Sequence, residues 1–122
     1  TVDRANTTTP LQALVTLNDT QFVETARAFA ERILARPGDD MGKLRWAFLE
    51  TNSRPPKPAE TAVLQAALQR ERKRYAANAT AAQQFLSTGE SPRNPKLPPV
   101  EHAAWAQVAA TLLNLSETVT RN

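Results

Sequence analysis

The densest group of side chains that can do chemistry is the run Arg70-Glu71-Arg72-Lys73-Arg74, which Tyr75 follows. Cations beside an aromatic ring are the side chains that hold the phosphates and bases of a nucleic acid. On a helix, however, successive residues point about 100° apart, so only Arg70 and Arg74 share a stripe. No Gly-rich loop or groove-reading motif accompanies the run. We therefore predict a solvated helix end. The alternative is an anionic polymer bound by the basic patch Arg70, Arg72, Lys73 and Arg74.

Catalysis by a serine–histidine or cysteine–histidine pair would have to use His102, the only histidine of the chain. It lies in the first turn of an expected helix, with Glu101 beside it and no obvious second metal ligand. The carboxylates are scattered over expected helix starts and exposed faces, whereas acid–base catalysis needs a pocket that perturbs them. We predict an exposed histidine and no catalytic residue, metal site or cofactor in this chain. Whether the chain belongs to an enzyme stays open.

The two tryptophans, Trp46 and Trp105, offer aromatic faces on which a sugar ring can stack. Both also lie near apolar stripes of expected helices, and large aromatic side chains supply much of the buried area of a core. Core packing is the interpretation that we prefer, with a sugar platform as the alternative.

Polar residues near the two ends of the chain form one further candidate binding site. They would meet if the first and last helices pack together, and an ion pair between Arg4 and Glu117 would then join the ends. The candidate binding residues are Arg4, Asn6, Asn114 and Glu117.

Residues that favour helix starts and stops define the helices that would position these side chains. Proline in a first turn and Asp, Asn or Thr before it favour helix starts, and Pro-Gly favours a stop. The expected helices begin at Pro10, after Asp19, after Asp39 or Asp40, at Pro58, at Thr80 and at Pro99. With Pro-rich loops at 52–58 and 89–99 and no alternating strand pattern, the sequence predicts an all-α, compact bundle of five or six helices.

Apolar residues at spacings of three and four predict which helix faces are buried. Charged residues such as Arg27 are expected mostly on the opposite faces. The predicted buried residues are Phe22, Ala26, Phe29, Ala30, Ile33, Leu34, Met41, Leu44, Phe48, Leu49, Val63, Leu64, Ala67, Leu68, Tyr75, Phe85, Leu86, Trp105, Val108, Ala109, Leu112, Leu113 and Leu115.

Length and composition fit a single helical domain at residues 1–122. The 122 residues contain no cysteine, which excludes disulfides, thiolate metal sites and covalent haem attachment within the chain. The net charge of +3 arises between residues 54 and 99, so a nucleic-acid partner is disfavoured. No apolar run approaches the roughly 20 residues of a membrane span. Because the sequence starts at Thr1, we expect a C-terminal fragment of a larger multidomain protein.

Three stretches, RANTTTPLQALVTLNDTQFVETARAFAERIL, SRPPKPAE and AAWAQVAATLLNLSETVTRN, resemble the C-terminal part of a planctomycete domain-of-unknown-function family, number 1553. That family occurs in planctomycete multidomain proteins with cytochrome c-like domains. The resemblance implies export to the periplasm or cell surface, with haem possible elsewhere in the full-length protein. It carries over no catalytic residue. Lys57 departs from the family pattern, in which threonine would complete a capping box with Glu60.

These observations favour a non-catalytic packing and interaction module. Its expected partners are the upstream domains of the same chain, with a polysaccharide or another protein also possible. One alternative is a wall of a pocket in a carbohydrate-degrading or redox-associated protein. The other is the anionic-polymer binder described above.

Overall fold

The computed structural model describes residues 19–87 and 93–120, excepting the side chains of residue 19 and of residues 116–120. Within these ranges the chain forms five helices and no strand, so the predicted all-α bundle is confirmed. They are α2 (Asp19–Leu34), α3 (Asp40–Asn52), α4 (Pro58–Ala77), α5 (Ala79–Leu86) and α6 (Pro99–Thr120). The helix expected to begin at Pro10 lies outside the described residues.

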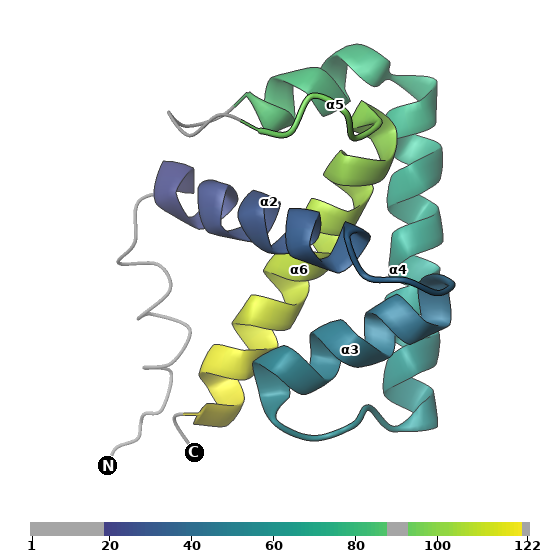
Figure 1. Ribbon diagram of the computed structural model, residues 1–122, viewed down its shortest axis with the longest axis vertical. Coiled ribbons are helices and arrows are strands. Elements are labelled where there is room, and N and C mark those ends of the chain that lie inside the picture. The colour runs from purple at the N-terminus through teal and green to yellow at the C-terminus, as the bar shows by residue number, and fades with distance from the viewer. Residues whose placement is uncertain (1–18, 88–92, 121–122) are drawn as a thin grey trace.

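α6 is the central helix and contacts each of the other four. In Figure 1, α2 crosses α6, and α3 lies below α2. α4 runs down the right of the view, and α5 lies at the top, near the amino-terminal end of α6. Small side chains on α6 let these neighbours approach closely. Half of its buried residues are alanines, which are interleaved with larger side chains: His102, Ala103, Ala104, Trp105, Ala106, Val108, Ala109 and Leu112.

The helices begin close to the capping residues and prolines predicted to start them. The Asp39 carboxylate accepts a hydrogen bond of 2.9 Å from the N–H of Gly42 and caps α3. Pro58 is the first residue of α4, and the carboxylate of Glu60 accepts from the N–H of Lys57 at 2.8 Å. One half of a capping box therefore forms although lysine stands where threonine was expected.

The ends of α2 and α3 depend on left-handed backbone. α2 ends before the Pro37-Gly38 turn, in which Gly38 has a φ of +106°. Ser53 ends α3 with a φ of 60°, and its N–H donates to the carbonyl of Leu49 at 2.9 Å. These two turns fold α3 back against α2 and direct the chain into α4.

Most of the predicted core is buried, but the expectation of burial is wrong for Met41, Leu49, Val63 and Leu115. Their exposed fractions are 41%, 46%, 67% and 41%. The predicted stripes were too wide, because α3 and α4 each pack on their neighbours along a narrow line through Phe48 or Leu68. A residue one position away from such a line is turned by about 100° towards solvent.

Arg72 joins three helices. Its guanidinium group binds the Asp40 carboxylate at 2.6 and 3.0 Å and the Glu101 carboxylate at 2.8 Å through two further hydrogen bonds. These contacts connect α4 to the first turns of α3 and α6. The hydrogen bonds from Arg72 are also the main reason why the pKa of Asp40 lies below its ordinary value.

Candidate functional site

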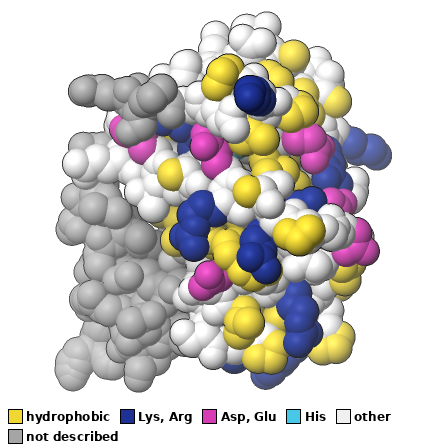
Figure 2. Space-filling model, in the orientation of Figure 1, with side chains coloured by type: hydrophobic (Ala, Val, Ile, Leu, Met, Phe, Trp, Pro, Cys, Tyr) yellow, Lys and Arg dark blue, Asp and Glu magenta, His cyan; other side chains and the backbone are white. Residues whose placement is uncertain are grey.

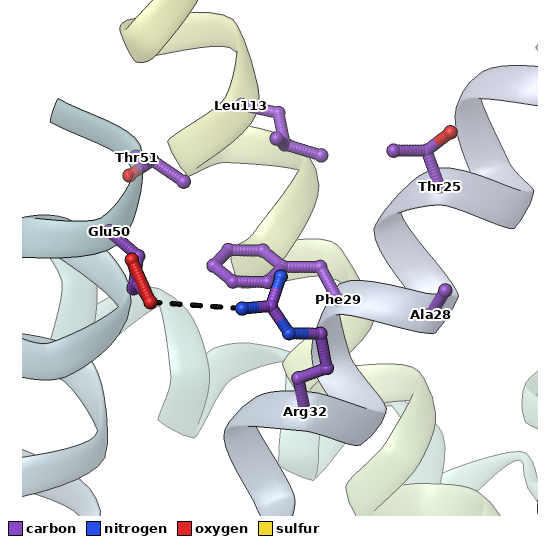
Figure 3. A pocket seen from close by; sticks show the side chains of 7 residues that line it. All are labelled: Thr25, Ala28, Phe29, Arg32, Glu50, Thr51 and Leu113. Atoms are coloured by element: carbon purple, nitrogen blue, oxygen red, sulfur yellow. Dashed lines mark ion pairs between the residues drawn. The ribbon is translucent and has the colours of Figure 1, made fainter.

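A pocket of about 500 Å³ opens where α2, α3 and α6 meet (Figure 3). Four residues of α2 lie on one stripe of that helix, because they are spaced by three, one and three positions. The carboxyl-terminal end of α3 and one residue of α6 complete the wall. The lining residues are Thr25, Ala28, Phe29, Arg32, Glu50, Thr51 and Leu113.

The two threonine hydroxyl groups beside this pocket are engaged by hydrogen bonds within their own helices. Thr25 donates its hydroxyl hydrogen to the carbonyl of Gln21 at 2.9 Å, and Thr51 donates to that of Ala47 at 2.9 Å. Asn52 then donates to the Thr51 hydroxyl at 2.8 Å. In Figure 3 the methyl groups of Thr25 and Thr51 face the pocket and their hydroxyl oxygens point away from it, so these residues and Leu113 give the pocket a largely apolar wall.

The charged rim of the pocket is a loose ion pair. Arg32 Nη2 lies 3.7 Å from Glu50 Oε1, and their side chains are 64% and 44% exposed. A separation beyond hydrogen-bonding distance in such exposed groups gives a pair worth at most about 1 kcal/mol. The pair can therefore open at little cost when a ligand competes for either partner.

Arginine and aromatic side chains extend the rim towards the α2–α3 turn. The Arg32 guanidinium carbon lies 5.7 Å from the Phe29 ring centroid and 5.6 Å from that of Trp46. Arg36 lies 4.9 Å from the Trp46 centroid. Trp46 is half-buried and packs on Phe29, with the ring centroids 6.1 Å apart. Two cations are thus positioned over one tryptophan by cation–π contacts.

A second, more apolar groove of about 370 Å³ lies between α3, α4 and α6. Its acidic member, Glu60, is engaged by Arg54 at 2.9 and 2.8 Å, and these bonds, with the N–H of Lys57, lower the pKa of Glu60 to about 2. What the groove presents to solvent is therefore mainly hydrocarbon. It is lined by Phe48, Ala59, Glu60, Val63, Leu64, Thr111 and Leu115.

The candidate residues near the chain ends are largely outside the described residues. Arg4 and Asn6 are not described, and Glu117 lies in α6 without a described side chain. Asn114 is half-buried inside α6. The Arg4–Glu117 pair and the binding site built on it stay predictions.

Most of the cationic side chains of the basic patch contact other side chains of the same protein. Arg72 binds two carboxylates, and Arg74 donates to the Tyr75 hydroxyl at 2.8 Å and lies 3.3 Å from Glu71. Arg70 lies 3.7 Å from Glu71 and has a 70% exposed side chain. Lys73 is exposed and has no partner in the described part of the chain. Binding of an anionic polymer through the patch stays a prediction.

The aromatic residues considered for stacking are mostly buried. Tyr75 is fully buried, with its hydroxyl also accepting from Gln107 at 2.9 Å, so the suggestion that it stacks on a base is wrong. Trp105 is 1% exposed and belongs to the core. A sugar platform built from Trp46 and Trp105 together is therefore excluded, as the preference for core packing anticipated.

The prediction of an exposed His102 is wrong, since its side chain is completely buried. His102 Nε2 lies 3.1 Å from the Arg27 carbonyl, and Nδ1 lies 3.1 Å from Arg93 Nη1. Arg27, expected on an outer face, is only 3% exposed and its guanidinium donates to the carbonyl of Leu86. His102 continues the buried stripe of α6 by one turn, at three positions before Trp105, and this spacing was the signal that could have identified it.

Sequence reasoning also missed the pocket of Figure 3. Its signals were the spacings of three between Phe29 and Arg32 and of four between Arg32 and Arg36, which place these side chains on one stripe. Among the described residues, no group of three His, Cys, Asp or Glu side chains is arranged to hold a metal ion. Within the same residues, no helix has the length and hydropathy needed to cross a membrane.

One known family matches the chain. The family described as PSD1, protein of unknown function (DUF1553), matches residues 1–68. No curated protein and no solved structure matches the chain. The matched residues include α2, α3 and the first half of α4, and so all of the residues that line the pocket of Figure 3 except Leu113.

Proposed function

The chain belongs to the PSD1 family of proteins of unknown function (DUF1553), and we propose that it acts as a non-catalytic helical packing and interaction module. The proposed setting is an exported planctomycete protein, periplasmic or on the cell surface, with cytochrome c-like domains upstream. That setting rests on the resemblance of the three sequence stretches described above.

The observation that carries the proposal is the apolar groove between α3, α4 and α6. Val63 is the most exposed large hydrophobic side chain of the described residues, at 67%, and Leu115 on the facing helix is 41% exposed. Leaving such side chains in water costs about 25 cal/mol per Å² of apolar surface, which a docked partner regains. A groove bordered by helices is suited to the apolar face of another helix. The proposed occupant is a helical segment of the upstream domains of the same protein.

A charge placed in the groove tests this proposal. In the Val63→Asp protein, binding of the separately expressed upstream domains should weaken by at least about tenfold, because an unpaired carboxylate would be desolvated on docking. Since Val63 is exposed, the thermal unfolding midpoint of the Val63→Asp protein should differ from that of the wild-type protein by only a few degrees. Isothermal titration calorimetry measures the affinity, and circular dichroism measures the unfolding.

Ala62→Asp is the matched control, because Ala62 is exposed on the same helix turn but does not line the groove. It introduces the same charge and should leave the affinity unchanged. Equal affinity of the Val63→Asp and wild-type proteins, or no binding of the upstream domains by either, would contradict the proposal.

The alternatives stay open beside it. A role as the wall of a pocket for carbohydrate or redox chemistry depends on Arg4 and Asn6, which lie outside the described residues. Binding of an anionic polymer predicts that heparin affinity drops when Arg70, Lys73 and Arg74 are neutralised together.

A further inference from the structure

Arg32 and Arg36 differ from most other arginines of the described chain in how their guanidinium groups are used. The guanidinium carbon of each lies over an aromatic ring, at 5.7 Å from the Phe29 centroid for Arg32 and 4.9 Å from the Trp46 centroid for Arg36. A cation–π contact uses the positive charge of the group rather than a hydrogen bond to an oxygen or nitrogen acceptor, so it leaves the N–H donors of the guanidinium group open to an incoming acceptor. The described residues give neither side chain a hydrogen bond. Both groups are thus oriented but retain their donors.

Other arginines show the contrast. Arg54 also lies over a ring, 4.9 Å from the Phe48 centroid, but its edge is bound by both oxygens of Glu60. Arg72 donates four hydrogen bonds to two carboxylates. Arg93 donates to two backbone carbonyls and to His102. An incoming anion would have to displace hydrogen-bonded partners at Arg54, Arg72 and Arg93. At Arg32 it would displace only the loose contact to Glu50, and the described residues give Arg36 no carboxylate partner.

Arg32 also lies beside a cavity. Arg32 belongs to the rim of the 500 Å³ pocket, whose apolar wall includes Ala28 and Leu113. Figure 2 shows the same combination on this face of the molecule, with Lys and Arg side chains around hydrophobic ones over α2 and α3. A ligand that suits the site must carry an anionic group next to an apolar group.

We propose that Arg32, Arg36 and the adjacent pocket bind an acidic peptide segment of a partner protein. One carboxylate of the segment binds the edges of the two guanidinium groups, and a neighbouring apolar side chain enters the pocket against Leu113. This site lies across α6 from the apolar groove and is separate from the proposed packing function.

A peptide fits these observations better than a sulfated or acidic glycan. Sugars bind aromatic residues by stacking on an open ring face, and here guanidinium groups lie over the rings of both Phe29 and Trp46. The polar groups in the pocket wall are also few for a ligand rich in hydroxyl groups, since the donors of Thr25 and Thr51 are used within their own helices.

Glu50 gives the proposal a directional test. Its carboxylate competes for Arg32 from 3.7 Å, so Glu50→Gln should strengthen peptide binding by about threefold. Arg32→Gln and Arg36→Gln should each weaken it by roughly tenfold, which corresponds to one hydrogen-bonded charge pair. Arg70→Gln removes the same charge from an exposed position on α4. It should reduce the peptide affinity only slightly, through the smaller net charge of the protein.

The experiment follows the indole N–H resonances of the 122-residue protein by NMR during titration with capped hexapeptides. In these peptides Glu alternates with Leu or Phe, and the matched peptides contain Gln in place of Glu. The Trp46 resonance should shift with the Glu peptides only, whereas the resonance of buried Trp105 serves as an internal control. The Val63→Asp protein should bind these peptides normally, so failure of the packing function would leave this result intact.

Three outcomes would overturn the proposal. The first is no shift of Trp46 with any Glu peptide at millimolar concentration. The second is an equal loss of affinity in the Arg70→Gln and Arg36→Gln proteins, which would indicate unspecific attraction. The third is tighter binding of a sulfated heparin disaccharide than of the peptides, which would assign the site to a glycan.

Discussion

His102 shows how one buried side chain ties several segments together. Neutral imidazole donates from Nε2 to the Arg27 carbonyl and accepts at Nδ1 from Arg93, and Glu31 Oε2 lies 3.8 Å from Nε2. The same Glu31 oxygen accepts from the N–H of Asn94 at 2.9 Å. His102 therefore joins α6 to α2 and to the loop before α6. These contacts are tertiary, so the sequence around His102 gave only its spacing from Trp105 as a sign of burial.

The first prediction concerns pH. Burial is the main cause that lowers the pKa of His102, with the Arg93 charge acting in the same direction and the Arg27 carbonyl and Glu31 opposing them. Because the pKa in the folded state lies below the unfolded value of 6.5, the unfolded chain binds the proton first as pH falls. The stability contribution is complete above about pH 6.5 and is lost as pH falls through the folded pKa.

Urea unfolding at several pH values between 8 and 5 measures this effect. The free energy of unfolding should decrease towards pH 5 in the wild-type protein. In His102→Gln it should be lower by about 1–3 kcal/mol at pH 8, since buried hydrogen bonds are disturbed, and should depend much less on pH. The pKa values of Asp40 and Glu60 are also lowered, from ordinary values of 3.8 and 4.5, so their effect is concentrated below this range. An equal pH dependence in both proteins would refute the assignment.

At the scale of elements, the sequence predicted helix starts better than helix faces. Asp39, Pro58 and Pro99 act on the backbone within their own turn, so their effect can be read locally. Exposure of Val63 depends instead on where α6 crosses α4, which no local pattern specifies. The pocket of Figure 3 was missed for the same reason, because Glu50 and Leu113 reach Arg32 only through the packing of three helices.

The second prediction concerns the junction of α3, α4 and α6 at Arg72. Arg72→Met would leave the carboxylates of Asp40 and Glu101 facing each other without their shared cation. Loss of one partner from a buried ion pair costs about 3–5 kcal/mol, and the 23% exposure of Arg72 reduces the expected loss to about 1–3 kcal/mol. Thermal and urea unfolding at neutral pH measure the change in stability.

Lys73→Met on the same helix is the control. Lys73 is exposed, so its replacement should alter the free energy of unfolding by no more than about 0.5 kcal/mol. Adding Asp40→Asn to Arg72→Met should recover part of the lost stability, because one of the two uncompensated charges is removed. Similar stabilities of the Arg72→Met and Lys73→Met proteins would show that the junction contributes little.

For the molecule as a whole, the family match and the core do not coincide. The match ends at residue 68, within α4, whereas α6 supplies much of the main core. Buried side chains of α2 to α4, among them Ile33, Leu44 and Leu68, share one cluster with Trp105 and Leu112 of α6. Fully burying each large side chain contributes about 1.5–3 kcal/mol, and a domain has a net stability of only about 5–15 kcal/mol.

The third prediction follows from this arrangement. A polypeptide of residues 1–77, which contains the whole family match, should show partial helicity but no cooperative thermal unfolding, because the faces that pack on α6 would be exposed. Residues 1–122 should unfold in one cooperative transition under the same conditions. Adding a peptide of residues 93–122 to the shorter polypeptide should increase helicity and restore a transition whose midpoint rises with peptide concentration. A cooperative transition of residues 1–77 alone would instead mean that the matched region folds by itself and that α6 is an accessory helix.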